Sequence, residues 1–174
     1  MFVKLYINLM IEKNAEKETF FSTNYFEKLY ELIKSNGFMS VIKNKKSQIL
    51  AIGVFLNGKK SSHYHLAASS KSHYSGLNNY LIYNAAMYAK KIGLDVLHLG
   101  GGNMNVKEDM LFKFKKSMSS NQHKFFIGKR VNKKDIYKQI KSEWKKRYPI
   151  LYEKYSNRLL CYQINTEILD TEIK

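Results

Sequence analysis

The apolar pattern of the chain changes its period once, between residues 68 and 77, and this change constrains the fold more than any other feature. Three short runs at residues 38–43, 48–56 and 61–68 are separated by turn residues, which predicts three strands in an antiparallel meander. Residues 77–92 instead repeat apolar positions near every fourth residue, as an amphipathic helix does, and a buried-type strand over 94–99 follows. A strand–helix–strand unit joined to a meander predicts an α/β (α+β) three-layer domain, with a mixed, mostly antiparallel sheet flanked by helices.

Turn and capping residues indicate where the other elements lie. Asn57-Gly58 is a two-residue hairpin signal, because both residues tolerate positive φ. One amphipathic helix is expected over residues 2–12, and a second begins after the capping oxygens of Ser22-Thr23-Asn24. The second half of the chain predicts a helix over 107–117, a strand at 123–128 and a basic helix at 132–147.

Length and the single cysteine narrow the class of protein. A chain of 174 residues is long enough for one domain around one core and is short for two. We expect one domain over residues 1–148 and a C-terminal tail over 149–174 with a helix or strand, because Pro149 ends the basic helical pattern. Cys161, the only cysteine, excludes an intramolecular disulfide, and its apolar neighbours indicate a small buried hydrophobe rather than a nucleophile.

The apolar runs of the chain are short. None approaches the roughly 20 residues that are needed to cross a bilayer, so no transmembrane segment is expected. The N-terminus is interrupted by Lys4 and Glu12 and lacks the small-residue cleavage site of a signal peptide. A cytoplasmic location follows as the expectation.

The net charge of +16 is concentrated in the second half of the chain. Residues 106–149 hold 14 Lys and Arg against 4 Asp and Glu. Such a surface attracts phosphates, nucleic acid or anionic lipid headgroups. The chain is also rich in Lys, Asn, Ile and Tyr together, as translation of an A/T-rich genome would give, and the alternative is that the charge is compositional drift on solvated faces. Both interpretations stay open.

Two glycine-containing turns and one lysine are the candidates for chemistry. Gly100, Gly101 and Gly102 end a buried strand, which allows a ligand to approach the backbone closely or simply makes a flexible turn. Ser75-Gly76 opens the helix over 77–92, where unpaired backbone N–H groups bind anions, although an ordinary strand-to-helix turn has the same pattern. Lys115 flanks an apolar helical face, so its ammonium is either presented to an oxyanion or phosphate or solvated.

Histidines are few and lack metal-ligand spacing. His63 and His65 share one face of a predicted strand on either side of Tyr64, but no third ligand is evident and no HExxH pattern occurs. We therefore expect no metal site. The chain also has no nucleophile elbow, phosphate-binding Walker loop, dinucleotide-binding fingerprint or paired-cysteine zinc motif.

Four segments taken in order resemble the Fem-type peptidoglycan-bridge aminoacyltransferases and their single-domain GNAT relatives. They are residues 64–69, 76–83, 93–102 and 111–118. The most specific parts are the Leu-Gly-Gly-Gly strand end at 99–102 and the Phe-Lys pair at 114–115, and the resemblance extends over roughly residues 2–140. It implies a GNAT domain that here lacks the usual first strand, because no strand pattern precedes the first helix.

The same resemblance implies the activity and its residues. Transfer of an acyl group to an amine is expected, with aminoacyl-tRNA as donor and an amine of a peptidoglycan precursor as acceptor. Phe114-Lys115 matches the family's catalytic Phe-Lys motif, whose lysine is associated with stabilising the tetrahedral intermediate. The matching segments further imply that substrate binds at residues Gly100, Gly101, Gly102, Tyr64, His65, Asn78 and Asn79. No metal and no tightly bound cofactor are expected.

Two other functions remain open at this point. Acetyl-CoA or another acyl-CoA is the rival donor, although Ser75-Gly76 is shorter than the glycine-rich loop expected for its pyrophosphate. The second is a non-catalytic, basic module that binds RNA or a cell-envelope precursor. The charge also fits peripheral contact with an anionic membrane.

Overall fold

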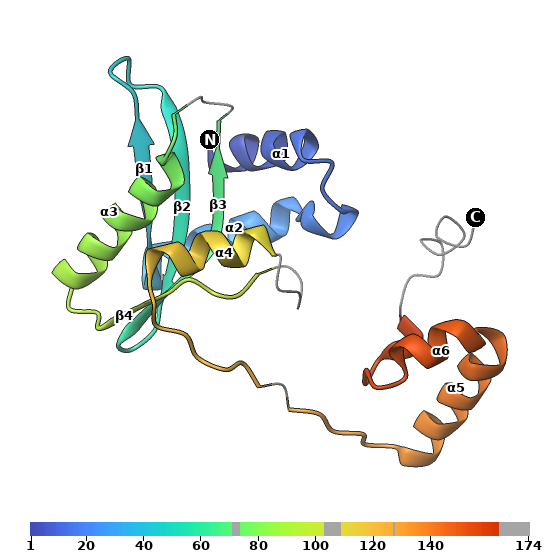
Figure 1. Cartoon of the computed structure of the whole chain (residues 1–174). Helices are drawn as coiled ribbons and strands as arrows, with labels where there is room; N and C mark the ends of the chain where they lie inside the picture. The colour runs from blue at the N-terminus through green and yellow to red at the C-terminus, as the bar shows by residue number, and fades with distance from the viewer. Residues whose placement is uncertain (71–73, 103–108, 127, 164–174) are drawn as a thin grey trace. The chain divides into compact units, whose positions relative to one another are not determined.

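The computed structural model describes residues 1–70, 74–102, 109–126 and 128–163 (Figure 1). The chain forms two compact units, Met1–Gln122 and His123–Lys174, which are described separately. Their boundary lies inside the range over which the sequence predicts a single domain, residues 1–148. Among the described residues, no helix combines the length and the apolar character that a membrane crossing requires.

The N-terminal unit contains the sheet and most of the helices. Its elements are α1 (Phe2–Glu12), a short 3-10 helix (Lys17–Thr19), α2 (Thr23–Asn36), β1 (Gly37–Lys43), β2 (Ile49–Asn57), β3 (Ser61–Ser69), α3 (Leu77–Lys91), β4 (Val96–His98) and α4 (Met110–Met118). Helix α2 begins where the sequence predicts, because the Ser22 hydroxyl accepts a hydrogen bond from the Tyr25 backbone N–H.

The four strands form one sheet in the order β1-β2-β3-β4. The pairs β1–β2 and β2–β3 are antiparallel and β3–β4 is parallel, which confirms the mixed, mostly antiparallel sheet. The β2–β3 hairpin is present, but the two-residue turn predicted at Asn57-Gly58 is wrong. Three residues, 58–60, connect the strands; the Gly58 N–H donates to the Ser61 carbonyl at 2.7 Å, and neither Asn57 nor Gly58 has positive φ.

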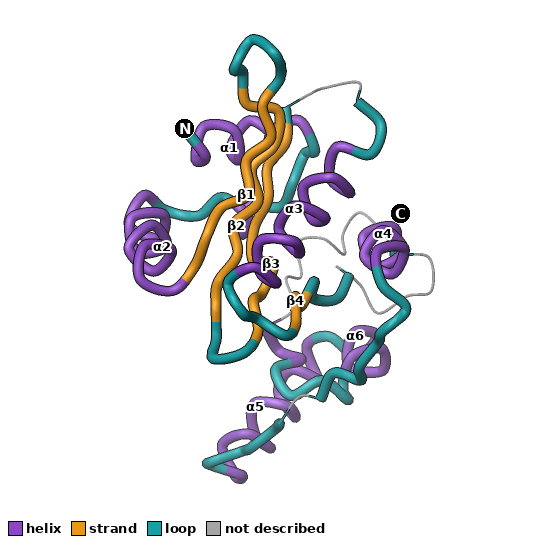
Figure 2. The backbone as a smooth tube through the Cα atoms, turned by 90° about the vertical axis from the view of Figure 1, so that its left-hand side faces the viewer, coloured by secondary structure: helices purple, strands orange, loops and turns teal. Residues whose placement is uncertain are grey.

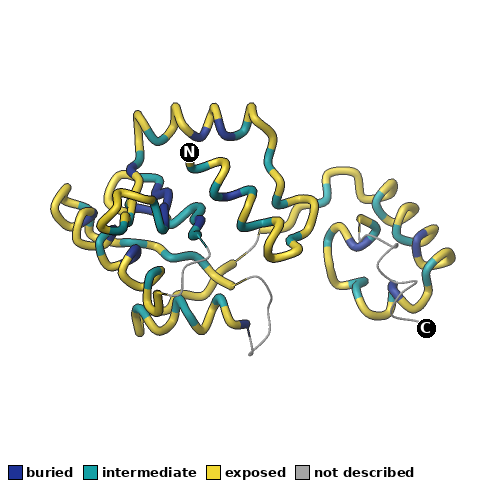
Figure 3. The backbone as a smooth tube through the Cα atoms, turned by 90° about the horizontal axis from the view of Figure 1, so that it is seen from above, coloured by how far each residue is buried: buried dark blue, intermediate teal, exposed yellow. Residues whose placement is uncertain are grey.

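Helices cover both faces of this sheet, giving the expected three layers. Figure 2 views the sheet edge-on, with α2 on one side and α3 on the other. Val54 packs with α1 and α2, whereas its neighbour Phe55 packs with Ala85 and Ala89 of α3. Successive residues of a strand point to opposite faces, so one buried strand contributes to both halves of the core. The helices of Figure 3 carry buried positions only at intervals, as helices with one inward face do.

Strands β3 and β4 stay together over a short distance only. They pair at Ser61–Val96, Ser62–Leu97 and His63–His98, and β4 ends there while β3 continues to Ser69. A β-bulge opposite Val54 and Phe55 leaves His65 as the extra residue of β3. The two parallel strands therefore part after His63 and His98.

The C-terminal unit is helical in its described part. It contains α5 (Lys134–Arg147), α6 (Pro149–Tyr155) and a 3-10 turn (Cys161–Gln163) around the buried side chains of Trp144, Leu151 and Cys161. Cys161 is a fully buried free cysteine, which confirms its prediction as a buried hydrophobe. The part of the expected tail at residues 164–174 lies outside the described residues.

The strand predicted at residues 123–128 is wrong. Residues 123–126 and 128 have no regular secondary structure, and residue 127 lies outside the described residues. Phe125 and Phe126 are 86% and 81% exposed, so this aromatic stretch has no sheet to pair with and no core to enter. An alternating pattern makes a strand only when a partner strand is available.

Candidate functional site

Helix α4 brings the two halves of the candidate site together. It begins at Asp109, whose carboxylate accepts a 2.8 Å hydrogen bond from the Phe112 N–H and is buried. Such a cap fixes the start and the rotation of the helix. Phe114 and Lys115 are consecutive, so their side chains diverge by about 100° around the helix axis. Phe114 lines a pocket beside α3, and Lys115 contacts the glycines that follow β4.

Lys115 lies against the glycine triplet. Its Nζ donates a 2.6 Å hydrogen bond to the Gly101 carbonyl oxygen. Burial lowers the pKa of the Lys115 ammonium, and the Asp109 carboxylate opposes this shift. The structure thus brings together Lys115 and the triplet that the sequence singled out. The contact is made by a backbone carbonyl, whereas the sequence hypothesis invoked backbone N–H groups.

The glycines of the triplet are required by the local geometry. Gly100 has a φ of +74°, a conformation that disfavours other residues. A Cβ placed on Gly102 would collide with the Asp109 carboxylate. The loop after β4 therefore accommodates the cap of α4 because it has no side chains there.

His63 and His98 form a pair at the point where β3 and β4 separate. Their Nδ1 atoms are 3.0 Å apart, and their rings stack with centroids 5.2 Å apart. Cε1 of His63 lies 3.6 Å from the position of a Cβ on Gly100, and Lys115 Nζ lies 3.5 Å from the same position. Burial lowers the pKa of His63, and the neighbouring charges of His98, His65 and Lys115 lower it further.

The sequence did not predict this histidine pair, because it grouped His63 with His65. The ring of His65 is 6.4 Å from that of His63, and its Nε2 instead lies 2.7 Å from the Tyr25 hydroxyl on α2. Burial lowers the pKa of His65. The available signal was His98 itself, a polar residue between Leu97 and Leu99 in a strand that had to pair with another.

Tyr64 lies away from these groups. Its ring stacks on Phe55 at 5.2 Å, in the cluster that packs under α3, and burial raises its pKa to about 12. Of the residues that the resemblance implied for substrate binding, Tyr64 therefore contributes to the core. Ordinary alternation along β3 accounts for the separation, since the adjacent residues His63 and Tyr64 point to opposite faces of the sheet.

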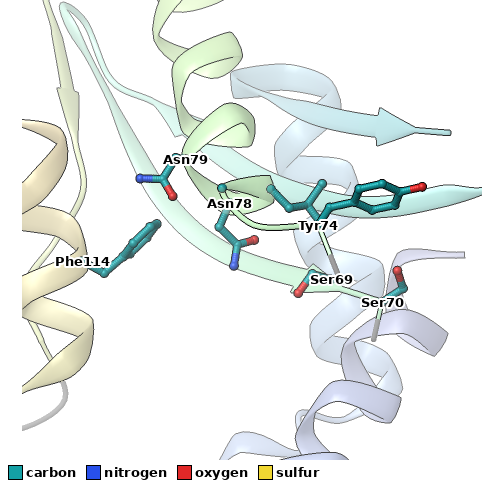
Figure 4. Close-up of a pocket in the computed structure, with 8 residues that line it drawn as sticks. Ser69, Ser70, Tyr74, Asn78, Asn79 and Phe114 are labelled. Carbon is teal, nitrogen blue, oxygen red and sulfur yellow. The ribbon is translucent and has the colours of Figure 1, made fainter. Parts of the chain in front are cut away.

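A pocket of about 260 Å³ lies where β3 ends and α3 begins. Figure 4 shows that Asn78 and Asn79 of α3 approach it from one side and Phe114 of α4 from another. The residues that line it are Ser69, Ser70, Tyr74, Gly76, Leu77, Asn78, Asn79 and Phe114. Three residues predicted for the site, Asn78, Asn79 and Phe114, are thus brought together here.

Polar groups of the first turn of α3 line this pocket. Gly76 caps α3 with a φ of +76° and makes no side-chain cap, so the backbone N–H groups of the first turn are not used by a capping side chain. Asn79 donates through Nδ2 to the Met118 sulfur at 3.2 Å, which joins α3 to α4 across the pocket. Within the described residues, His, Cys, Asp and Glu side chains do not gather in threes as a metal site requires.

Comparisons with known proteins bear on the fold. No protein-family model matches the chain, and no curated protein matches it in sequence. An aminoglycoside acetyltransferase from an uncultured soil metagenomic sample superimposes with a TM-score of 0.53 at 13% identity, over 75% of this chain and 90% of that one. A protein from Pyrococcus furiosus, to which acetyl transferase activity is attributed, gives a TM-score of 0.51 at 15% identity, over 75% and 91% of the two chains. The chain has a GNAT-like fold.

A third structure superimposes to a similar extent. A mutant of the BH1408 protein from Bacillus halodurans gives a TM-score of 0.51 at 12% identity, over 74% of this chain and 88% of that one. The superposition on the aminoglycoside acetyltransferase confirms the GNAT-like fold predicted from the sequence. At these identities the likeness extends to the fold alone, and it gives no support to the Fem-type aminoacyltransferases in particular.

Proposed function

We propose that the chain transfers an acyl group from acyl-coenzyme A to a primary amine. The pocket formed by the end of β3, the first turn of α3 and Phe114 carries this proposal, because it lies in a GNAT-like fold and Phe114 is the neighbour of Lys115 on α4. The amine nitrogen forms a bond to the thioester carbonyl carbon, the carbon–sulfur bond breaks, and the products are an amide and the free thiol of coenzyme A.

The first turn of α3 binds the phosphates of the donor. The positive end of a helix dipole and unpaired backbone N–H groups favour an anion. Among the described residues, no contacting atom lies within 4 Å of a Cβ position on Gly76, which leaves the approach open. The side-chain amides of Asn78 and Asn79 supply further donors at the same edge. Uncharged donors of this kind orient a phosphate without a metal ion.

Lys115 stabilises the charge that develops on the carbonyl oxygen. Its ammonium is half-buried beside Gly100, close to where β4 ends, and it donates a hydrogen bond to the Gly101 carbonyl. In a partly dry site, the attraction between a preorganised cation and the carbonyl oxygen increases as negative charge forms on that oxygen. This is the basis of oxyanion stabilisation. Phe114, the neighbouring residue on α4, lines the donor pocket and gives the acyl chain an apolar wall.

A turnover assay tests the proposed function. The full chain is incubated with acetyl-CoA and, separately, with glucosamine, spermidine, tyramine or kanamycin, while free thiol and acetylated amine are measured. We expect thiol release that depends on the amine and matches the amide formed. Thiol release without amide would be hydrolysis, and absence of both with every amine would contradict the proposal.

Aminoacyl-tRNA is the second candidate donor. The described part of the C-terminal unit, residues 123–163, holds 12 Lys and Arg against 3 Asp and Glu, and its two exposed phenylalanines could stack on bases. Under this hypothesis the acceptor is an amine of a peptidoglycan precursor. Transfer of a labelled amino acid from charged tRNA, with none from acetyl-CoA, would favour it over the acyl-CoA proposal.

Two further properties depend on the donor. An acyl-CoA or aminoacyl-tRNA donor implies a cytoplasmic reaction, because both are cytoplasmic metabolites. The basic surface also fits peripheral contact with an anionic membrane. Sedimentation with phosphatidylglycerol vesicles tests that contact; binding that is lost at high salt supports it, and absence of binding at low salt contradicts it.

A further inference from the structure

The side chains of His63 and His98 are in contact across the parallel strands β3 and β4. They are partners in the β3–β4 register, and they are the last pair before the strands diverge. We propose that His63 is the base that takes a proton from the amine, and that His98 is its positioning residue. This inference rests on the proposed acyl transfer and assigns to it a residue that the resemblance did not supply.

The Nδ1–Nδ1 contact leaves Nε2 as the nitrogen of His63 that is not used in the pair. A hydrogen bond between two imidazole nitrogens 3.0 Å apart requires one donor and one acceptor. When His63 donates its Nδ1–H to His98, its own Nε2 carries a lone pair and can accept a proton. His98 then carries its proton on Nε2. In this neutral pair His63 is the Nδ1–H tautomer and His98 is the Nε2–H tautomer.

The position of the His63 ring favours it over His98 as the base. Its Cε1, which lies between the two ring nitrogens, approaches Gly100, and Lys115 Nζ approaches the same glycine. His63 and Lys115 therefore approach the same backbone position, and Nδ1 rather than Nε2 is the His63 nitrogen in contact with His98. A base and an oxyanion donor at one backbone position allow proton removal and charge stabilisation at the same carbonyl.

The groups around His63 keep it neutral near pH 7. Burial lowers its pKa, and the electrostatic influence of His98 from β4, His65 from β3 and Lys115 from α4 acts in the same direction. Two other groups face the neighbours of His63 rather than His63 itself. The Asp109 carboxylate interacts with Lys115, and the Tyr25 hydroxyl of α2 contacts His65. A base must be unprotonated to act, so these neighbours extend its working range toward acid pH.

The proposed step balances as follows. The amine arrives as an ammonium ion, and His63 Nε2 accepts one proton, which later passes to solvent. The nitrogen lone pair forms the carbon–nitrogen bond, and the carbon–sulfur bond breaks with its electron pair on sulfur. The second proton lost by nitrogen ends on that sulfur, giving the free thiol.

Two histidine substitutions separate the roles of the pair. With acetyl-CoA and the best amine of the four named above, H63Q should lower kcat about 100-fold while the KM for acetyl-CoA is unchanged. H98A should lower kcat, and H98N should restore it, because Asn again offers an acceptor to the Nδ1–H of His63. A structural role alone would not distinguish H98A from H98N.

The pH dependence supplies a second readout. Because His98 is the largest charged contributor that lowers the pKa of His63, H98N should move the acid limb of kcat to higher pH, and H65Q should move it less. NMR titration of the His63 ring proton in the full chain should show the same order of pKa shifts, whether or not the assay amines are good substrates.

The outcomes are distinct for the two proposals. If the wild-type chain shows no turnover with any of the four amines, the proposed function is contradicted. Turnover of H63Q at the wild-type rate would overturn the assignment of the base and leave the function standing. An acid limb that is unchanged in H98N would overturn the positioning role of His98.

Discussion

The pocket at the start of α3 and the group around Lys115 differ in how their polar atoms are held. The pocket offers uncharged donors from Gly76, Asn78 and Asn79, and its shape follows from the turn between β3 and α3. The other group consists of titratable side chains: Lys115, which donates to the Gly101 backbone carbonyl, and His63, which contacts His98. Uncharged backbone donors suit binding, whereas charged and proton-sharing groups suit a reaction. Changes in the first region should affect affinity and changes in the second should affect rate.

The largest expected effect is on the rate, through Lys115. K115M should lower kcat about 100-fold, because the oxyanion loses a charged donor while the donor pocket is intact. The measurement is kcat and KM for acetyl-CoA. K116M is the matched control, since Lys116 is an exposed lysine on the same helix, and it should keep wild-type kinetics. A raised KM with normal kcat in K115M would mean that Lys115 contributes to binding of acetyl-CoA. The division between a binding pocket and a reactive group would then be wrong.

A smaller effect is expected on stability, at the cap that orients α4. D109A should lower the free energy of unfolding by about 1–2 kcal/mol, because the buried carboxylate caps Phe112. S22A removes the exposed cap of α2, whose hydrogen bond is 3.3 Å long, and should cost less, about 0.5 kcal/mol. Urea unfolding of both variants measures the difference. Equal losses would mean that burial of the cap contributes nothing to fixing α4.

The smallest effect is the dependence of stability on pH. The folded pKa of His63 lies below its ordinary value of 6.5, so the unfolded chain binds protons first as the pH falls. Stability contributed by neutral His63 is present above about pH 6.5 and decreases as the pH falls through the folded pKa. H63Q should therefore lose less stability than wild type between neutral and mildly acid pH. An equal or larger loss in H63Q contradicts this.

Local signals in the sequence predicted most of the fold. The helices over 2–12 and 77–92 are α1 and α3 within one residue, because apolar spacing along one helix requires no knowledge of the rest of the chain. The last strand is shorter than the predicted 94–99, since β4 pairs only as far as His98. Partners that are distant in sequence decide how long a strand is.

The candidate site was predictable in its parts and less so in its contacts. The glycine triplet and Lys115 were singled out, and the structure places them in contact through a carbonyl. The His63–His98 pair was missed because the register of parallel strands depends on the crossover through α3, which local spacing does not encode. The exposed aromatics at 125–126 were misinterpreted as a strand for the same reason: no partner could be checked.

The central claim is that acyl-CoA binds at the start of α3, and calorimetric titration with acetyl-CoA tests it most directly. Gly76 and Gly93 flank the two ends of α3, and both have positive φ. In the part of the chain that the structure describes, no contacting atom lies within 4 Å of a Cβ position on either glycine. G76A and G93A should therefore lose similar stability, of about 1 kcal/mol, from backbone strain. The account predicts stoichiometric binding to the wild-type chain and to G93A, and weaker binding to G76A. Equal affinities for the two variants, or no binding to the wild-type chain, would contradict it.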